Sequence, residues 1–539
     1  MKIKTRSRFI SLLNIGLVMM LLSGCAAPVV TPVENVGDAS SWDRFEAELE
    51  SVRQLMKIPG LSAAVVMDQK LVWAKGFGYA DLENRIEVTP DTPFPLASVT
   101  KTVAAVLIMQ LVREGVISLD DPVSKYGVEL TSQGTILVRH LLTHTSTGVP
   151  GTTYIYDGDR YAYLAQIAER ATGKPFGALM QERILSPLGM TNTWMDKTCG
   201  QDISTVQVAK PYQLDQSYNV IEGIYSVRGF NAAAGLISTV EDLAKFDIAL
   251  DQNVLLHEET KEKMLAPAVA MVPGRPDLSH GLGWFSTEFM GTRLNWHTGR
   301  MPPSASANII KAPEQNLTFI ILANTDHLNV PWSYDISYQT MALAFYETLV
   351  YPRQSGKTVP EVNWEADEKA LVDQLSKVTD SDLRKILERE LWAYRQLFAS
   401  VGKTDLVDRL LRVHQQAYPD YPPTELDLYT YQGRVGGFSP ALSDQVHLAE
   451  AELERFAGEY ILSDQTNNTS LPPEASLQVI NGKLVVSTTI GCYDLVSVTS
   501  TRFTTPEQQF YVSIYINGEA VERMTVSISG IEAVYIPKE

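Results

Sequence analysis

One stretch of this sequence restricts the possible folds more than any other. Residues 95–101 read Pro-Leu-Ala-Ser-Val-Thr-Lys and lead into an apolar run that ends at Val112. The run is apolar almost all the way round, which predicts a helix buried at the centre of a large domain. Ser98 and Lys101 are three residues apart, so their side chains share one face of that helix.

This pair has the chemistry of an activated nucleophile. A serine hydroxyl is a weak nucleophile and gains reactivity from an adjacent base. A lysine in a buried helix costs free energy unless it has partners or a chemical task. The amino end of a helix also favours an anion, here the oxyanion that forms when Ser98 attacks a carbonyl. We therefore predict that Ser98 is a nucleophile and that Lys101 assists it.

The spacing alone is weak evidence, because Ser400 and Lys403 share it. Gly402 follows an apolar helical pattern and Thr404 begins another, so this second pair is predicted to mark a turn between helices. The prediction for Ser98 depends on its surroundings.

The N-terminal residues have the pattern of an export signal. A basic start is followed by an apolar run over residues 9–22, too short for a comfortable membrane span, which ends in Leu-Ser-Gly-Cys25. This resembles a bacterial lipoprotein signal. We expect residues 1–24 to be a signal peptide, Cys25 to carry the lipid that anchors the protein to the membrane, and residues 25–41 to be a tether. An ordinary secretory signal with an incidental cysteine is the alternative.

Composition limits the partners. The chain has 539 residues and a net charge of -18, which argues against nucleic acid as a partner. The expected location is the cell envelope, at the periplasmic face of the outer membrane.

Cys199 and Cys492 are the other cysteines. Two free buried thiols are the favoured interpretation, and a disulfide between them is the alternative.

The chain divides into segments of different pattern. Residues 42–352 alternate helical and strand-like runs, residues 353–445 are mostly helical in period, and residues 446–539 contain many short strands joined by Gly-containing turns. The last pattern predicts a small closed or nearly closed barrel.

Two further motifs carry residues that can act beside a serine. Tyr156 precedes Asp157 and Gly158 at the start of a predicted helix, where a tyrosine can reach a neighbouring serine. Residues 297–300, His-Thr-Gly-Arg, are placed at the end of a predicted strand, where a glycine permits close backbone approach to a ligand.

His140 and His144 have the spacing of a helical metal pair, but no nearby acidic third ligand completes a zinc pattern. We predict that these histidines are structural and satisfy backbone groups of the next loop.

In this order, Ser98-Val99-Thr100-Lys101, Tyr156-Asp157-Gly158 and His297-Thr298-Gly299 resemble the motifs of the serine β-lactamase / DD-peptidase superfamily. The nearest branch is the class C β-lactamase-related serine hydrolases, which include esterases and D-amino-acid peptidases. The resemblance covers roughly residues 42–350. Residues 446–539 resemble, more loosely, the lipocalin-like domain often appended to this branch.

The resemblance implies an α+β fold: a five-stranded antiparallel sheet flanked by helices, beside an all-helical subdomain, with the site between them. It implies Ser98 as nucleophile, Lys101 as the group that helps remove its proton, and Tyr156 as general base and as acid toward the leaving group. We expect cationic Lys101 and His297 to lower the pKa of Tyr156. The implied oxyanion hole is the backbone N–H of Ser98 and of Arg300.

His297, Thr298 and Gly299 are the implied substrate-binding residues beside Arg300, and no metal or organic cofactor is implied. Two positions depart from the family pattern. Gly158 stands where the family usually has Asn, which puts amide and β-lactam recognition in doubt; Asp157, Asp159 or Asn231 are candidates to compensate. His297 stands where penicillin-recognising members have Lys, and Arg300 is the candidate replacement cation.

The predicted function is an exported serine hydrolase that forms an acyl-enzyme on Ser98 and acts on an ester or a small D-amino-acid amide. The alternative is a non-catalytic or weakly active penicillin-binding-type protein that binds cell-wall fragments or a partner. Gly158 favours the alternative, whereas intact Ser98, Lys101 and Tyr156 oppose it.

Overall fold

The computed structural model describes residues 39–195, 208–215, 217–223, 229–302, 304–329, 334–419 and 448–463, and the barrel residues 474–480, 482–488, 491–497, 500–504, 511–517, 520–528 and 531–538. The predicted signal peptide, most of the tether, Cys25 and Cys199 lie outside these residues. Within the described part of the chain, no helix combines the length and the apolar character needed to span a membrane.

The centre of the hydrolase-like part is an antiparallel sheet of nine strands in the order β3-β2-β1-β14-β13-β12-β11-β10-β9. The resemblance implied five strands. The sheet is wider because β9 to β11 extend one edge and the short β3 pairs with β2 at the other. The strands are β1 (Gly60–Met67), β2 (Lys70–Asp81), β3 (Ile86–Glu87), β9 (Val269–Val272), β10 (Arg275–His280), β11 (Phe285–Phe289), β12 (Thr292–Met301), β13 (Ala305–Ala312) and β14 (Leu317–Ala323).

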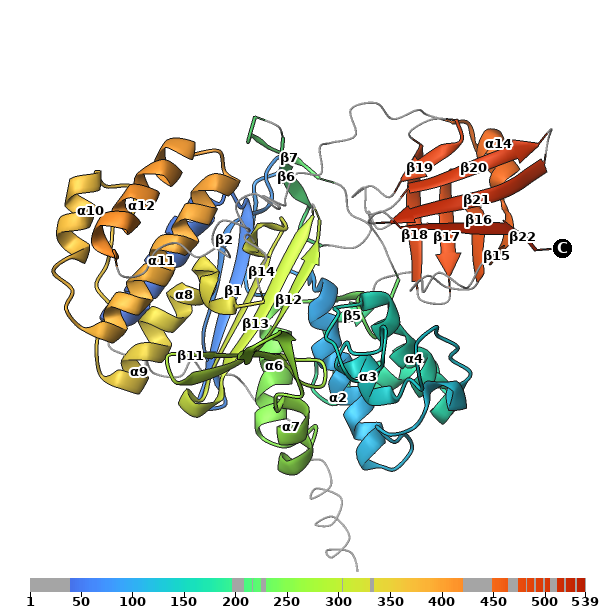
Figure 1. Ribbon diagram of the computed structural model, residues 1–539, viewed down its shortest axis with the longest axis horizontal. Coiled ribbons are helices and arrows are strands. Elements are labelled where there is room, and N and C mark those ends of the chain that lie inside the picture. Colours follow the sequence, from blue (N-terminus) through green and yellow to red (C-terminus); the bar gives the residue numbers. More distant parts are fainter. Residues whose placement is uncertain are drawn as a thin grey trace, which may run out of the picture. The chain divides into compact units, whose positions relative to one another are not determined.

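Both faces of this sheet are buried, because successive side chains of a strand point to opposite sides. In β1, Ala64 and Val66 join one hydrophobic cluster, whereas Ala63 and Val65 join another. Helices α2 (Thr100–Arg113) and α6 (Val240–Asp251) belong to the first cluster, and α1 (Ala39–Leu55) and α8 (Thr340–Phe345) to the second (Figure 1).

The helical subdomain contains α2, α3 (Val138–Leu142), α4 (Gly158–Thr172) and α5 (Phe176–Met180), and its residues share the first cluster. The remaining helices around the sheet are α7 (Glu258–Leu265) and α9 (Tyr351–Ser355). Helix α2 is buried along almost its whole length, as its sequence predicts. The α+β fold that the resemblance implied is confirmed in this part of the chain.

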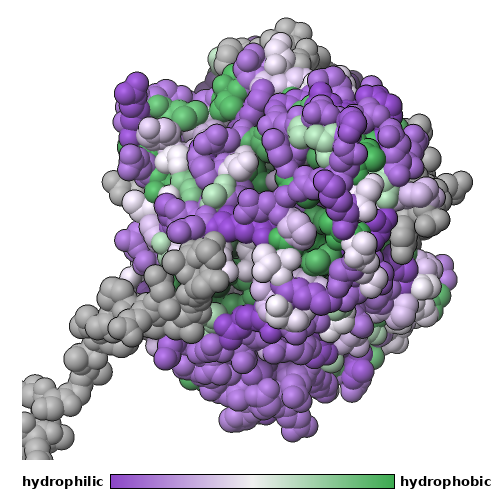
Figure 2. All heavy atoms as spheres, turned by 90° about the vertical axis from the view of Figure 1, so that its left-hand side faces the viewer, coloured by the Kyte–Doolittle hydropathy of each residue, from purple (hydrophilic) through white to green (hydrophobic). Residues whose placement is uncertain are grey.

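A helical group follows the sheet in sequence: α10 (Glu368–Leu375), α11 (Ser381–Ser400) and α12 (Thr404–Ala417). It joins the second cluster through one apolar side of each helix, and its outer face is mostly hydrophilic (Figures 1 and 2). Ser400 Oγ donates to the Leu397 carbonyl and Lys403 Nζ lies 2.7 Å from a Glu365 carboxylate oxygen, so this Ser-x-x-Lys pair is structural, as predicted.

The C-terminal strands form a closed antiparallel barrel, as predicted, in which β15 pairs with β22. A short helix, α14 (Glu450–Leu453), precedes it. The strands are β15 (Gly458–Leu462), β16 (Glu474–Ile480), β17 (Lys483–Thr488), β18 (Gly491–Ser497), β19 (Arg502–Thr504), β20 (Tyr511–Asn517), β21 (Ala520–Ile528) and β22 (Ile531–Pro537).

Cys492 is disulfide-bonded, and its partner lies outside the described residues. The favoured prediction of two free thiols is therefore wrong. The segment boundaries at residues 352 and 445 stay predictions.

Candidate functional site

The turn that carries Ser98 is held in a strained conformation. Residues Ala97–Val99 form a 3₁₀ turn, η1, directly before α2, and Ala97 has φ +45°, which is costly for a residue with a side chain. Strand β8 (Leu236–Ser238) pairs with β4 (Phe94–Pro95) just before the turn. The Leu96 N–H donates to the Leu236 carbonyl at 2.9 Å, and the Leu236 N–H donates to Thr100 Oγ1 at 3.2 Å. These bonds fix both sides of the turn.

Lys101 lies in the first turn of α2 and is only 1% exposed. Its Nζ is 3.0 Å from Ser98 Oγ and 2.9 Å from the Ala233 carbonyl oxygen. Two aromatic rings flank the amine, with Tyr156 and Tyr161 at 5.2 and 5.5 Å from Nζ to the ring centroids. The predicted Ser98–Lys101 contact is therefore present.

Burial lowers the pKa of Lys101 to about 7, and the negative charges of Asp159 and then Asp157 oppose that fall. Near neutral pH, a large share of Lys101 is therefore uncharged. An uncharged amine beside a serine hydroxyl can accept its proton.

Tyr156 lies two residues before α4, with its ring between the helical subdomain and the sheet. It stacks on His144 with 4.3 Å between ring centroids and on Phe285 of β11 at 6.0 Å. A hydrogen bond to Ser98 favours the phenolate, but burial dominates and raises the pKa of Tyr156. The sequence-based expectation of a lowered pKa is wrong, because desolvation outweighs any nearby positive charge.

The third motif lies inside a strand and not at its end, because β12 continues to Met301. Gly299 brings β12 against the Ser98 turn: a Cβ at this position would lie 2.0 Å from the Leu96 carbonyl oxygen and 3.3 Å from Ser98 N. Only a glycine permits this contact. The backbone around Arg300 is thereby held next to the nucleophile.

Neither His297 nor Arg300 offers a free cation. His297 is buried, its Nδ1 donates to the Thr298 carbonyl at 2.7 Å, and its pKa is well below 6.5, through burial first and then the positive charge of Lys101. The Arg300 side chain is 33% exposed, and its Nε and Nη2 lie 3.0 and 2.8 Å from one oxygen of Asp326. Arg300 is thus engaged by Asp326, which reduces its availability as a replacement cation.

Gly158 leaves space where the family has a side chain. It is the first residue of α4, and a Cβ placed there would lie 3.7 Å from Lys101 Nζ, an ordinary contact distance. Asn231 does not fill that space directly: its Oδ1 accepts from Ala233 N at 2.7 Å and so positions the carbonyl that binds Lys101. Asp157 and Asp159 act on Lys101 through charge.

His140 and His144 are both structural, as predicted, but only His144 binds a backbone group of the loop that follows; His140 caps the start of its own helix, α3. His140 Nδ1 accepts from Leu137 N at 3.1 Å, and His144 Nδ1 accepts from Asp157 N at 3.0 Å. The hydrogen bond from Asp157 N to His144 fixes the start of α4 directly after Tyr156 in the chain. Sequence reasoning missed His280 of β10, whose ring lies 5.1 Å from that of His144 and whose pKa is lowered to about 3 by burial. No sequence pattern marks His280.

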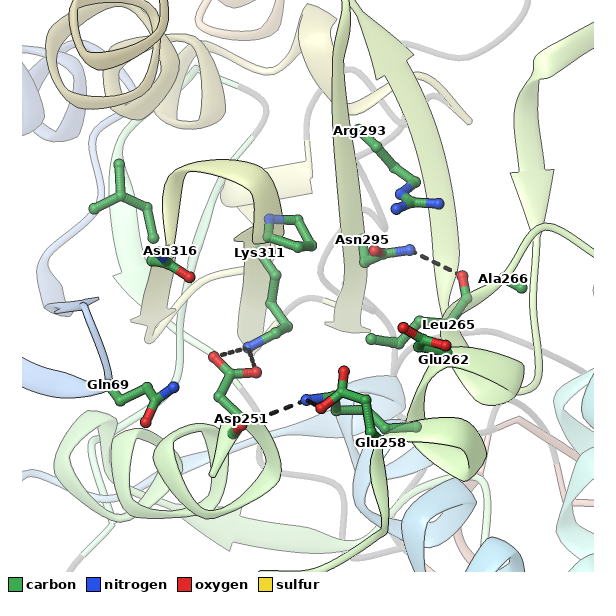
Figure 3. Close-up of a pocket in the computed structure, with 13 residues that line it drawn as sticks. Gln69, Asp251, Glu258, Glu262, Leu265, Ala266, Arg293, Asn295, Lys311 and Asn316 are labelled. Atoms are coloured by element: carbon green, nitrogen blue, oxygen red, sulfur yellow. Dashed lines mark hydrogen bonds and ion pairs between the residues drawn. The ribbon is translucent and has the colours of Figure 1, made fainter. Parts of the chain in front are cut away.

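A separate open pocket of about 560 Å³ lies between α6, α7 and the strands β12 to β14 (Figure 3). None of the three motifs contributes to its lining. Two lysines in its lining form ion pairs with acidic residues of the same lining: Lys311 Nζ is 3.0 Å from Asp251, and Lys261 Nζ is 3.1 Å from Glu258. This pocket is therefore not part of the candidate site.

Comparison with known proteins gives a consistent result. Residues 50–343 match the family described as Beta-lactamase. A beta-lactamase of Escherichia coli strain K12 is 27% identical over 256 residues, which cover 42% of this chain and 66% of that protein. The putative penicillin-binding protein PbpX of Bacillus subtilis strain 168 is 28% identical over 253 residues, 42% of this chain and 64% of that protein. The chain thus spans just under two thirds of these relatives.

Solved structures share the fold. The octameric penicillin-binding protein homologue from Pyrococcus abyssi superposes with a TM-score of 0.51 at 20% identity, over 92% of this chain and 99% of that chain. EstCE1, described as a hydrolase with promiscuous acyltransferase activity, has a TM-score of 0.50 at 17% identity, over 58% of this chain and 100% of that chain. At these identities the likeness concerns the fold alone.

Proposed function

The chain belongs to the beta-lactamase family, and we propose that it is a serine hydrolase that forms an acyl-enzyme on Ser98 and acts on esters or small amides, including D-amino-acid amides. The observation that carries this proposal is the 3.0 Å contact between Ser98 Oγ and the buried amine of Lys101. A lysine whose pKa is about 7 is matched to general-base catalysis near neutral pH.

In the first step, uncharged Lys101 accepts the proton of Ser98 as Oγ bonds to the substrate carbonyl carbon. The carbonyl oxygen becomes an oxyanion, and the backbone N–H groups of Ser98 and Arg300 are the proposed donors that stabilise it. The close packing of Gly299 on Leu96 and Ser98 supports this pairing of the two N–H groups. Loss of one such donor typically costs on the order of 100-fold in rate.

Collapse of the oxyanion breaks the bond to the alkoxide or amine leaving group, which must receive a proton. Tyr156 is suited to donate it, because its raised pKa keeps the phenol protonated and it hydrogen-bonds Ser98. The proton held by Lys101 can restore the phenol. Water then attacks the acyl-enzyme by the same steps in reverse and frees Ser98. Tyr156 thus acts as acid and proton relay in this account.

Esters rank ahead of β-lactams as substrates. A β-lactam antibiotic carries a carboxylate that needs a cation, and the candidate cations here are largely neutral or already engaged: His297 is uncharged and Arg300 binds Asp326. Gly158 also removes an amide-binding side chain. Ester hydrolysis needs fewer of these contacts, because an ester has no amide group for the enzyme to hydrogen-bond.

The test is turnover by the purified full-length protein and Ser98→Ala on a short-chain p-nitrophenyl ester, a chromogenic cephalosporin and a D-Ala-D-Ala peptide. The proposal expects ester hydrolysis fastest, cephalosporin hydrolysis slowest, and all activity lost in the variant. Activity that survives in Ser98→Ala would contradict the proposal. Absence of turnover on all three would favour the binding-protein alternative that Gly158 suggests.

We also propose export and lipid anchoring at Cys25, which rest on the sequence pattern of residues 1–25. Several acyl chains would hold the protein durably at a membrane, since each buried methylene adds roughly 0.8 kcal/mol. In a Gram-negative host, the wild-type protein should fractionate with the outer membrane and Cys25→Ala should not carry lipid. A wild-type protein recovered without lipid would contradict this part of the proposal.

A further inference from the structure

A second group of reactive side chains lies on the opposite side of the sheet from the helical subdomain. Glu48 of α1, Glu347 of the π-turn η7 (Tyr346–Val350) and Glu390 of α11 come from three separate elements. One carboxylate oxygen of each lies within 4.8 Å of the other two. Segments about 40 and 300 positions apart in the sequence therefore converge on one point.

The carboxylate of Glu347 points into this group without a protein partner. Glu347 is 0% exposed, and neither of its two side-chain oxygens has a hydrogen-bond donor. Glu390 is bound on one side only, where Trp364 Nε1 donates to its Oε1 at 2.7 Å, and its Oε2 has no donor. Buried polar atoms are rarely left without a partner. A metal cation, which accepts electron pairs from oxygen, would satisfy these carboxylate oxygens.

Burial raises the pKa of all three carboxyl groups, and the one nearby guanidinium, that of Arg44, only partly opposes this rise. Ionised together, the three carboxylates would carry two negative charges more than Arg44 balances. Arg44 is shared with the exposed Glu361, 3.5 Å from its Nε. A divalent cation would balance the remaining charge.

The donor set and its size select the kind of cation. Carboxylate oxygens suit hard cations, and two oxygens on opposite sides of Ca²⁺, each about 2.3–2.6 Å away, are about 4.6–5.2 Å apart. The three oxygens already lie within that span. Mg²⁺ dehydrates reluctantly and is usually bound through only one or two carboxylates with several waters, so three converging carboxylates favour Ca²⁺. Three bidentate carboxylates would supply six ligand oxygens.

We propose that Glu48, Glu347 and Glu390 form a structural Ca²⁺ site that fastens α11 to α1 and η7. The site joins the helical group α10 to α12 to the helices that cover the sheet. It is independent of the serine chemistry. A π-turn, the element that carries Glu347, is a rare feature that often marks functional positions.

The first test measures metal in the wild-type protein. Full-length protein prepared with Ca²⁺ and then desalted should retain about one Ca²⁺ per chain by elemental analysis. After removal of metal with EDTA, saturating Ca²⁺ should raise the midpoint of thermal unfolding by roughly 5 °C. No retained Ca²⁺ and no shift would overturn the proposal and identify three protonated carboxyl groups instead. A shift with Mg²⁺ or Mn²⁺ alone would also overturn it as stated.

Variants locate the site. Tb³⁺, which replaces Ca²⁺, should show emission sensitised by Trp364, and excess Ca²⁺ should quench it. Glu347→Gln should abolish both the emission and the Ca²⁺-dependent shift, and Trp364→Phe should weaken the emission. Glu361→Gln, an exposed carboxylate beside Arg44 with 76% exposure, is the matched control and should behave as wild type. An unchanged shift in Glu347→Gln would overturn the proposal. If that variant does not fold, the wild-type measurements decide.

Discussion

At the scale of single residues, the site depends on what burial does to two side chains. The same desolvation lowers the pKa of Lys101 and raises that of Tyr156, so at neutral pH a large part of the amine is uncharged and the phenol holds its proton. The sequence identified both residues, but their protonation depends on how deeply the fold buries them. The raised pKa of Tyr156 therefore argues against its expected role as a base and is consistent with its other expected role, that of acid toward the leaving group.

The burial of Lys101 predicts a definite pH dependence. Only its uncharged form accepts the Ser98 proton, so kcat/KM for an ester should rise as the pH is raised through about 7 and level off above it. Lys101→Met should lose about 10²- to 10⁴-fold in kcat/KM and lack this inflection. Lys403→Met removes the lysine of the second Ser-x-x-Lys and serves as control. A wild-type profile that is flat between pH 5 and 9 would contradict the assignment of the base.

The empty space at Gly158 predicts a change of specificity. An Asn there would place its amide next to Lys101, because a Cβ at Gly158 meets Lys101 Nζ at an ordinary 3.7 Å. Gly158→Asn should fold and should increase the rate on a D-amino-acid amide relative to a p-nitrophenyl ester, by roughly tenfold for one good hydrogen bond. Gly158→Ala, which adds only the methyl group, should leave the ratio unchanged. An equal ratio in both variants would show that the missing Asn is not what limits amide turnover.

At the scale of elements, the site forms where strand β12 packs against the η1 turn. The sequence predicted the strand and the turn separately, and it ended the strand too early, at the motif itself. Residues 297–300 are polar and contain a glycine, which is the pattern of a strand end, yet pairing with β13 continues through Met301. Tertiary hydrogen bonds override the local pattern here. The strain at Ala97 has no signal in the sequence either.

The contact between these elements predicts a severe effect for a small substitution. In Gly299→Ala, the new methyl group would meet the Leu96 carbonyl oxygen at 2.0 Å, so β12 and η1 must separate. We expect a loss of about 1–3 kcal/mol in the free energy of unfolding and of most activity. Denaturant unfolding and ester turnover measure the two effects. Gly158→Ala is the control, since its methyl group finds space; equal stability of the two variants would refute the tight contact.

At the scale of the whole molecule, three short motifs in one order were enough to predict the fold class, because together they resemble a family and the resemblance implies its fold. The C-terminal barrel was predicted from its many short strands joined by turns that contain glycine. The width of the sheet could not be predicted, since β9 and β3 are short edge strands that depend on their neighbours. The disulfide at Cys492 could not be predicted, because sequence does not tell whether two distant cysteines meet.

The most direct test of the central claim, that Ser98 is the nucleophile of a hydrolase, is covalent labelling. The full-length protein is treated with a fluorophosphonate, digested and mapped by mass spectrometry, beside Ser98→Ala and Ser400→Ala. We predict a single adduct on the peptide that contains Ser98, absent from Ser98→Ala and retained in Ser400→Ala. No adduct on the wild-type protein, or an adduct that persists in Ser98→Ala, would contradict the account.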